Sequence, residues 1–347
     1  MATVTETPPK PAPGRGRLRR SDCRTQGIVR IGAGRGFAFR DADGERIDDE
    51  ETLARIRELA IPPAWKEVWI CPDPLGHLQA TGIDAAGRKQ YLYHDRWQRR
   101  RAERKFAVVR EFAGQLPRLR RAVTADLRRR GMPRERALAC AVRLLDLGFF
   151  RVGGEVYAEE NESFGLATVR REHVTLRRNE VVFDFPAKSG QRRVQSIRDL
   201  AARRALETMR RRRSGPEDLL AWRDGEGEWH DVRSADVNDY IKDRIGEDYS
   251  AKDFRTWHGT VLAAVELAGE PEPASEAAFK RSVRRAIERV SEALGNTPAV
   301  CRRSYVDPRV IQRFRDGETI SPRASVGGRM SARARARIER EVRALIS

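Results

Sequence analysis

The chain has 347 residues, with 69 Lys and Arg against 51 Asp and Glu and a formal net charge of +18. Apolar residues make up 39% and charged residues 35%, which excludes a wholly disordered chain. So large a charge excess predicts a polyanionic partner. No segment approaches the roughly 20 consecutive apolar residues of a membrane span. Residues 1–20 lack the apolar stretch of a secretory signal, so we expect a cytoplasmic protein that binds no membrane.

The first 95 residues divide into a basic arm and a small β-rich domain. Residues 1–20 combine four prolines with four arginines and are predicted to be disordered. Short apolar runs bounded by turn residues follow, which predict strands in a domain over residues 21–95. One helix is expected among them, because Leu53, Ile56 and Leu59 fall at three-residue spacing and Pro62 ends the run.

From residue 96 the pattern becomes mainly helical. We expect helices over residues 98–112, 116–130, 134–147, 197–213, 236–245, 256–267, 276–294 and 331–346. Strand patterns over residues 167–176, 181–185 and 193–197 predict a small antiparallel sheet within this region. The predicted fold class is therefore α+β, with a small β-rich domain followed by a larger, mainly helical domain over residues 96–347.

The cysteines and histidines give no sign of a metal site. The four cysteines are scattered without a CxxC pair, and the five histidines form no HExxH or other close cluster. We therefore predict no metal and no cofactor.

Four motifs in a fixed order carry the chemistry of the chain. They read FFRVGG at 149–154, FPAKSG at 185–190, KDFRTWHG at 252–259, and LGNTP at 294–298 followed by RRSY at 302–305. Any one of them could arise by chance. In this order, behind a β-rich domain that contains GRKQYLY at 87–93, they resemble the type IB DNA topoisomerases of the bacterial and poxvirus branch.

The resemblance implies catalytic roles for five residues. Tyr305 matches the nucleophile, and Arg151 and Arg255 match the two arginines that bind the phosphate. Lys188, in a predicted hairpin tip, matches the general acid. Asn296 stands where poxvirus members have a histidine, and its amide can still donate a hydrogen bond to a phosphate oxygen.

These residue types suit strand cleavage followed by resealing. A tyrosine ester preserves the phosphodiester bond energy, so no ATP is required. Guanidinium groups offer paired donors to the non-bridging phosphate oxygens. A lysine beside two guanidiniums has its ammonium form disfavoured, which suits it to protonate the leaving 5′ oxygen. Three cations around one phosphate would also remove the usual need for magnesium.

The resemblance extends to residues that contact DNA. It implies DNA contacts for Arg88, Gln90, Tyr91 and Tyr93, and Lys252 is expected to assist the site. We therefore expect a monomer that relaxes supercoiled duplex DNA, forms a 3′-phosphotyrosyl intermediate and needs no protein partner.

Two alternatives stay open. The first is a tyrosine recombinase, since these enzymes have a similar catalytic fold. Recombinases typically have His-x-x-Arg in the second arginine motif and a helical amino-terminal domain. This chain has Lys252-x-x-Arg255 and a β-rich front. A nucleoid-binding protein without activity would explain the positive charge, but it would not explain the order of the motifs.

Overall fold

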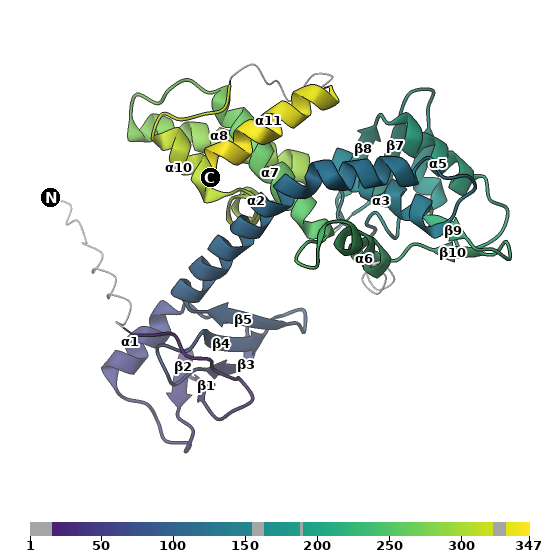
Figure 1. The fold of residues 1–347 in the computed structure, drawn as a ribbon. Helices are drawn as coiled ribbons and strands as arrows, with labels where there is room; N and C mark the ends of the chain where they lie inside the picture. Colours follow the sequence, from purple (N-terminus) through teal and green to yellow (C-terminus); the bar gives the residue numbers. More distant parts are fainter. Residues whose placement is uncertain (1–15, 155–162, 188–189, 322–330) are drawn as a thin grey trace. The chain divides into compact units, whose positions relative to one another are not determined.

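The computed structural model of the chain describes residues 16–154, 163–187, 190–321 and 331–347 (Figure 1). The chain forms two compact units, one ending at Arg104 and the other beginning at Lys105. The division falls inside helix α2 (Asp95–Asp126). The first unit is β-rich and the second is mostly helical, which confirms the predicted fold class.

The first unit is built on a five-stranded antiparallel sheet in the order β2-β1-β3-β4-β5. Its elements are β1 (Ile28–Ala33), β2 (Gly36–Arg40), α1 (Glu50–Glu58), β3 (Lys66–Ile70), β4 (Leu78–Ile83) and β5 (Lys89–Tyr93). The buried side chains of its separate small core are Ile28, Ile56, Val68, Ile70 and Ala80. The sheet therefore has an apolar core of its own.

Helix α1 confirms the helix predicted between the strands. Asp49 caps its start by accepting a hydrogen bond from the backbone N–H of Thr52 at 2.9 Å. Ile56 is buried in the core of the unit, and Leu59 packs at its edge. Residues 16–20 run beside the loop before β4, where the Arg19 N–H donates to the Leu75 carbonyl at 2.9 Å.

The second unit contains most of the helices of the chain. After α2 come α3 (Arg134–Leu147), a short 3-10 turn (Arg171–His173), and the antiparallel strands β6 (Val174–Leu176), β7 (Val181–Pro186) and β8 (Arg192–Ile197). The remaining elements are α5 (Leu200–Arg210), β9 (Ala221–Arg223), β10 (Trp229–Asp231), α6 (Ser234–Ile245), α7 (Ala251–Ala268), α8 (Glu276–Leu294), α9 (Pro298–Ser304), α10 (Pro308–Arg315) and α11 (Ala332–Leu345).

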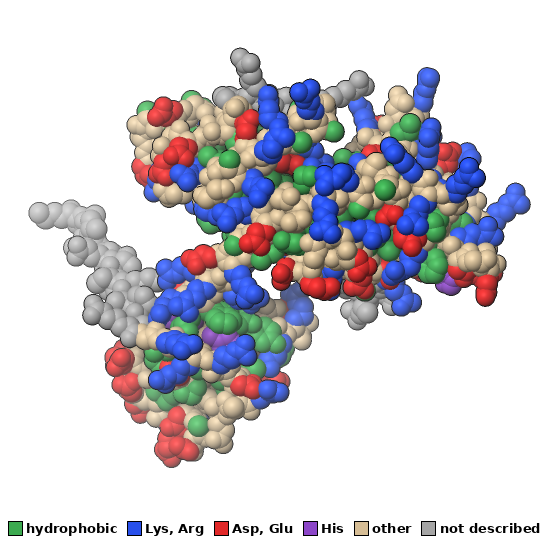
Figure 2. Space-filling model, in the orientation of Figure 1, with side chains coloured by type: hydrophobic (Ala, Val, Ile, Leu, Met, Phe, Trp, Pro, Cys, Tyr) green, Lys and Arg blue, Asp and Glu red, His purple; other side chains and the backbone are tan. Residues whose placement is uncertain are grey.

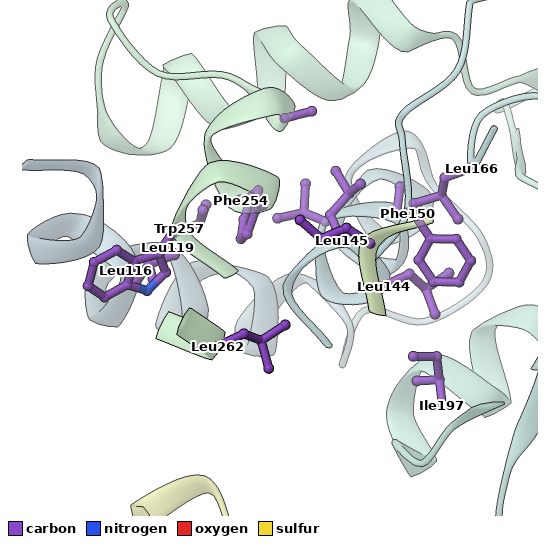
Figure 3. Packing of buried hydrophobic residues seen from close by; sticks show 14 of the residues in the cluster. Leu116, Leu119, Leu144, Leu145, Phe150, Leu166, Ile197, Phe254, Trp257 and Leu262 are labelled. Atoms are coloured by element: carbon purple, nitrogen blue, oxygen red, sulfur yellow. The ribbon is translucent and has the colours of Figure 1, made fainter. Parts of the chain in front are cut away.

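A single large apolar core holds the second unit together. Trp257 and Phe254 of α7 are fully buried among side chains of α2 and α3, including Leu116 and Leu144 (Figure 3). Phe150, directly after α3, belongs to the same core and packs edge-on against Phe183 of β7, with ring centroids 4.9 Å apart. The apolar core therefore packs against the first arginine motif on two sides, one formed by helices and the other by strand β7.

Helix α2 differs from the sequence-based expectation of two helices over residues 98–112 and 116–130. It continues through Pro117. Its buried apolar side chains follow one stripe at three- and four-residue spacing on both sides of the proline, namely Phe106, Val109, Phe112, Leu116, Leu119 and Val123. Burial of this stripe outweighs the hydrogen bond that a proline removes from a helix.

The strand predicted over residues 167–176 is also wrong in extent, because only Val174–Leu176 is a strand. The backbone of the earlier part pairs elsewhere. The N–H groups of Leu166 and Ala167 donate to the carbonyls of Arg151 and Val152 at 2.8 and 2.7 Å. This segment therefore supports the first arginine motif instead of extending the sheet.

Charge covers much of the surface. In Figure 2 the Lys and Arg side chains are spread over the visible face of both units, with Asp and Glu side chains among them. In the part of the chain that the structure describes, no helix is both long enough and apolar enough to cross a membrane.

Candidate active site

The first arginine motif is a loop fixed on both sides. Helix α3 ends at Leu147, and the two hydrogen bonds from residues 166 and 167 hold the loop from the other side. Gly153 has φ of +88°, and a side chain at Gly165 would collide with its Cα atom, so the two backbones approach closely because both residues are glycines. The Arg151 side chain therefore projects from a rigid loop.

Helix α8 ends where the phosphate-binding asparagine was predicted. Gly295 caps the helix in the left-handed conformation, with φ 59° and ψ 56°, and the Asn296 N–H donates to the Ser291 carbonyl at 3.1 Å. Arg151 donates from Nη2 to the Gly295 carbonyl at 3.1 Å and to Oδ1 of Asn296. The Nδ2 donor of Asn296 is buried and meets no nitrogen or oxygen acceptor among the described residues.

Arg255 comes from the second turn of α7. The helix starts five residues earlier than predicted, because Asp253 closes a capping box with the backbone and hydroxyl of Ser250. Arg255 is only 4% exposed, and it donates to the Phe149 carbonyl at 2.7 Å and to the Leu294 carbonyl. Burial, together with the charge of Arg151, lowers the pKa of Arg255 to about 10, so it still carries its charge at neutral pH.

Three arginines meet at the carboxyl end of α8. Successive carbonyl groups of residues 293, 294 and 295 accept hydrogen bonds from Arg193, Arg255 and Arg151 respectively. The last carbonyls of a helix lack intrahelical partners and carry partial negative charge, so they attract cations. The end of α8 thus gathers guanidiniums from β8, from α7 and from the loop after α3.

Tyr305 lies against this cluster as the cap residue of α9. Its N–H donates to the Cys301 carbonyl at 2.9 Å, and its carbonyl accepts from Thr260 Oγ1 of α7 at 3.3 Å. Gly259 leaves room for this approach, because a Cβ atom there would lie 2.5 Å from the Tyr305 carbonyl oxygen. The guanidinium carbon of Arg255 lies 5.1 Å from the centre of the Tyr305 ring. The structure therefore brings Tyr305, Arg151, Arg255 and Asn296 together.

Lys105 is a second positively charged residue beside the Tyr305 ring, and it was not predicted from the sequence. Its Nζ donates to the Ser304 carbonyl at the end of α9 and lies 5.6 Å from the centre of the Tyr305 ring. Burial lowers the pKa of Lys105. Lys105 is the single lysine among the arginines of α2, but no local motif marks it, because its partner is 199 residues away.

The two remaining residues predicted for the site are Lys188 and Lys252. Lys188 lies outside the described residues, which end at Ala187 on one side of it and resume at Gly190. The strands that flank it, β7 and β8, pair in register up to Pro186 and Arg192. Lys252 is exposed in the first turn of α7, three residues before Arg255.

The predicted DNA contacts of the first unit lie on and beside β5. Tyr91 and Tyr93 stack with nearly parallel rings, and Tyr91 is 47% exposed. Arg88 and Gln90 both bond the Asp84 carboxylate, with the Gln90 bond at 2.8 Å. Hydrogen bonds from Arg88, first of all from its backbone, lower the pKa of Asp84 to about 2. Asp84 thus fixes the polar side chains, and the two tyrosines offer stacking surface.

Two family models match this chain. Residues 94–320 match the model of the "Eukaryotic DNA topoisomerase I, catalytic core". Residues 36–84 match the model of the "Bacterial DNA topoisomerase IB, N-terminal domain". The first match alone spans more than half of the chain and includes the residues gathered around Tyr305.

Viral relatives match over most of their length. A "DNA topoisomerase 1B" of Acanthamoeba polyphaga mimivirus is 29% identical over 296 residues, which cover 81% of this chain and 85% of the relative. The "DNA topoisomerase I" of monkeypox virus and the "DNA topoisomerase 1B" of vaccinia virus (strain Copenhagen) are each 22% identical, over 78% of this chain and 84% of the relative.

Proposed function

The chain belongs to the DNA topoisomerase I family, in its ATP-independent type IB class, and we propose that it relaxes supercoiled duplex DNA through a covalent bond between Tyr305 and a 3′ phosphate. One observation carries the proposal. The ring of Tyr305 lies beside a cluster of three guanidiniums, those of the buried Arg255 and the partly buried Arg151 and Arg193, and no carboxylate of the described residues lies within ion-pair distance of them. Such a cluster suits an anionic substrate next to a nucleophile.

The proposed cleavage step exchanges one phosphate ester for another. The Tyr305 oxygen bonds to phosphorus as the bond from phosphorus to the 5′ oxygen breaks, and the phenol proton passes to solvent. Arg151, Arg255 and Asn296 bind the non-bridging oxygens, where negative charge grows in the transition state. Lys188 protonates the leaving 5′ oxygen. The free 5′ end rotates, and the reverse reaction reseals the strand without ATP or metal.

The proposed substrate is duplex DNA, bound by one copy of the chain without a protein partner. The stacked tyrosines of β5 and the basic side chains beside them would contact the bases and phosphates. We place the activity in the bacterial cytoplasm, on the nucleoid.

The test is covalent trapping on linear DNA. A 5′-labelled duplex is incubated with the protein, denatured with detergent and run on a denaturing gel, which maps a cleavage site. The wild-type protein should hold the labelled strand covalently. Tyr305→Phe keeps the ring and removes the hydroxyl, so it should bind the duplex with wild-type affinity and form no adduct. An adduct formed by Tyr305→Phe would refute the assignment of the nucleophile.

The role of Lys188 is tested on the mapped duplex with a 5′-bridging sulfur at the cleavage site. A thiolate leaves without a proton, so this substrate does not need a general acid. Lys188→Ala should cleave the normal duplex slowly and the sulfur duplex at close to the wild-type rate. A rate that stays equally low on both substrates would show that Lys188 is not the acid.

A further inference from the structure

Arg193 stands in the guanidinium cluster although no motif marks it. It lies on β8, and its Nη2 donates to the Ala293 carbonyl, next to the carbonyl that Arg255 binds. Its Nη1 approaches Gly295, where a Cβ atom would lie only 3.3 Å away. Arg193 therefore reaches the residue whose carbonyl Arg151 binds.

No carboxylate of the described residues forms an ion pair with Arg193. Burial, and then the charge of Arg151, lower the pKa of Arg193. In the described part of the chain it makes one hydrogen bond, to Ala293, and no ion pair, so its Nη1 and Nε donors are unused there. Keeping a partly buried guanidinium beside two others costs free energy unless an anion joins them.

The preceding residue shows the ordinary behaviour of an arginine on this surface. Arg192 points away from the cluster and is 75% exposed. It pairs with the Asp184 carboxylate through both Nε and Nη2, the first at 2.7 Å. Adjacent residues on one strand thus present one paired and one unpaired arginine, which gives a matched control.

We propose that Arg193 is a third arginine of the site and binds a non-bridging oxygen of the phosphate that Tyr305 attacks. The inference rests on the proposed function, because it requires the scissile phosphate to occupy the cluster at the end of α8. It adds a contact from β8 to those assigned to Arg151 and Arg255. With three guanidiniums, the site neutralises more of the charge that develops on the phosphate in the transition state.

The experiment compares Arg193→Met with Arg192→Met in single-turnover cleavage of the mapped duplex. Loss of one transition-state donor typically lowers the rate by about 10²-fold or more. We expect a fall of that order for Arg193→Met, with DNA affinity and thermal midpoint close to wild type. Arg192→Met should stay within about threefold in rate, because its side chain faces solvent. Arg193→Lys keeps the charge without the fork and should fall between them.

A duplex with a methylphosphonate at the cleavage site separates direct contact from support of the fold. Each stereoisomer replaces one charged non-bridging oxygen by a neutral methyl group. If Arg193 binds one of these oxygens, the defect of Arg193→Met should shrink to within about threefold on the isomer that lacks it. An equal defect on both isomers and on the normal duplex would overturn the proposal, as would a wild-type rate for Arg193→Met. If the wild-type protein forms no adduct, or Tyr305→Phe does, the proposed function itself fails.

Discussion

His258 is a buried histidine one turn along α7 from Arg255. Its Nε2 lies 3.4 Å from a guanidinium nitrogen of Arg335, and its ring packs edge-on against Phe149, whose carbonyl binds Arg255. Burial lowers the pKa of His258 from its usual 6.5 to about 4, and the charge of Arg335 adds to the effect. The imidazole is therefore neutral at physiological pH and supports the position of Phe149 by packing.

This shift predicts how stability depends on pH. The unfolded chain takes up a proton on His258 below about pH 6.5 while the folded protein does not, so stability falls as the pH falls. The nearby carboxylates of Asp146 and Glu339 have lowered pKa values and stay ionised in this range. Between pH 7 and pH 5 the free energy of unfolding should drop by about 2 kcal/mol from His258 alone.

Urea unfolding at pH 7 and pH 5 measures this contribution. His258→Gln has no group that titrates at this position, so its loss of stability between the two pH values should be smaller than the wild-type loss by about 2 kcal/mol. Equal losses in the two proteins would mean that His258 is protonated in the folded state.

Residues of the site could be predicted from the sequence only where a local motif marks them. Tyr305, Arg151, Arg255 and Asn296 each stand in such a motif, and the structure brings the four together. Arg193 could not be found in this way. Its place in the cluster depends on the pairing of β8 with β7 and on where α8 ends, which are both long-range features.

At the scale of elements, α11 is part of the second unit, although it lies beyond the region that matches the family model, which ends at residue 320. Arg335 donates to the Asp146 carboxylate at 2.8 Å, and Arg120 of α2 binds both Asp146 and Glu339. Burial acts to raise the pKa of Asp146, but Arg335 and Arg120 outweigh it and hold the pKa well below its usual range. Asp146 lies three residues before the first arginine motif, so this network of ion pairs holds the end of α3 from which the motif continues.

A pair of substitutions on α11 tests the network. Arg335→Met removes one partner of the buried Asp146 carboxylate and should lower the free energy of unfolding by about 3 kcal/mol. Arg337→Met, on the same helix, removes an arginine that is 52% exposed and pairs with Glu341, so it should change stability by no more than about 0.5 kcal/mol. Urea midpoints at pH 7 give both values, and equal effects would show that the network does not stabilise the fold.

Elements were predictable where the pattern is local. The bounds of α8 agree with the helix predicted from its apolar spacing, residues 276–294. Helices α9 and α10 were not predicted, since each spans only two turns and is fixed by a cap, Thr297 for α9 and Asp307 for α10. The start of α7 was placed too late, because its first turn depends on the capping box at Ser250 and not on apolar spacing.

At the scale of the whole molecule, the charge excess and the two units fit an enzyme of the type IB class. Residues 36–84 and 94–320 match models from the two parts of such enzymes, and they lie in the β-rich and the mainly helical regions respectively. The excess of 69 basic over 51 acidic residues favours binding to a phosphate backbone. Composition could predict the polyanion, but only the four motifs together could predict cleavage of DNA.

Relaxation of a supercoiled plasmid tests the central claim most directly. The wild-type protein and Tyr305→Phe are incubated with the plasmid in EDTA and without ATP, and the products are separated on an agarose gel. The wild-type protein should relax both positively and negatively supercoiled plasmid, because in the proposed mechanism the arginines and Lys188 supply the charge and the proton that the reaction needs. Tyr305→Phe should leave the plasmid supercoiled. Wild-type activity that is absent in EDTA and restored by magnesium, or relaxation by Tyr305→Phe, would contradict this account.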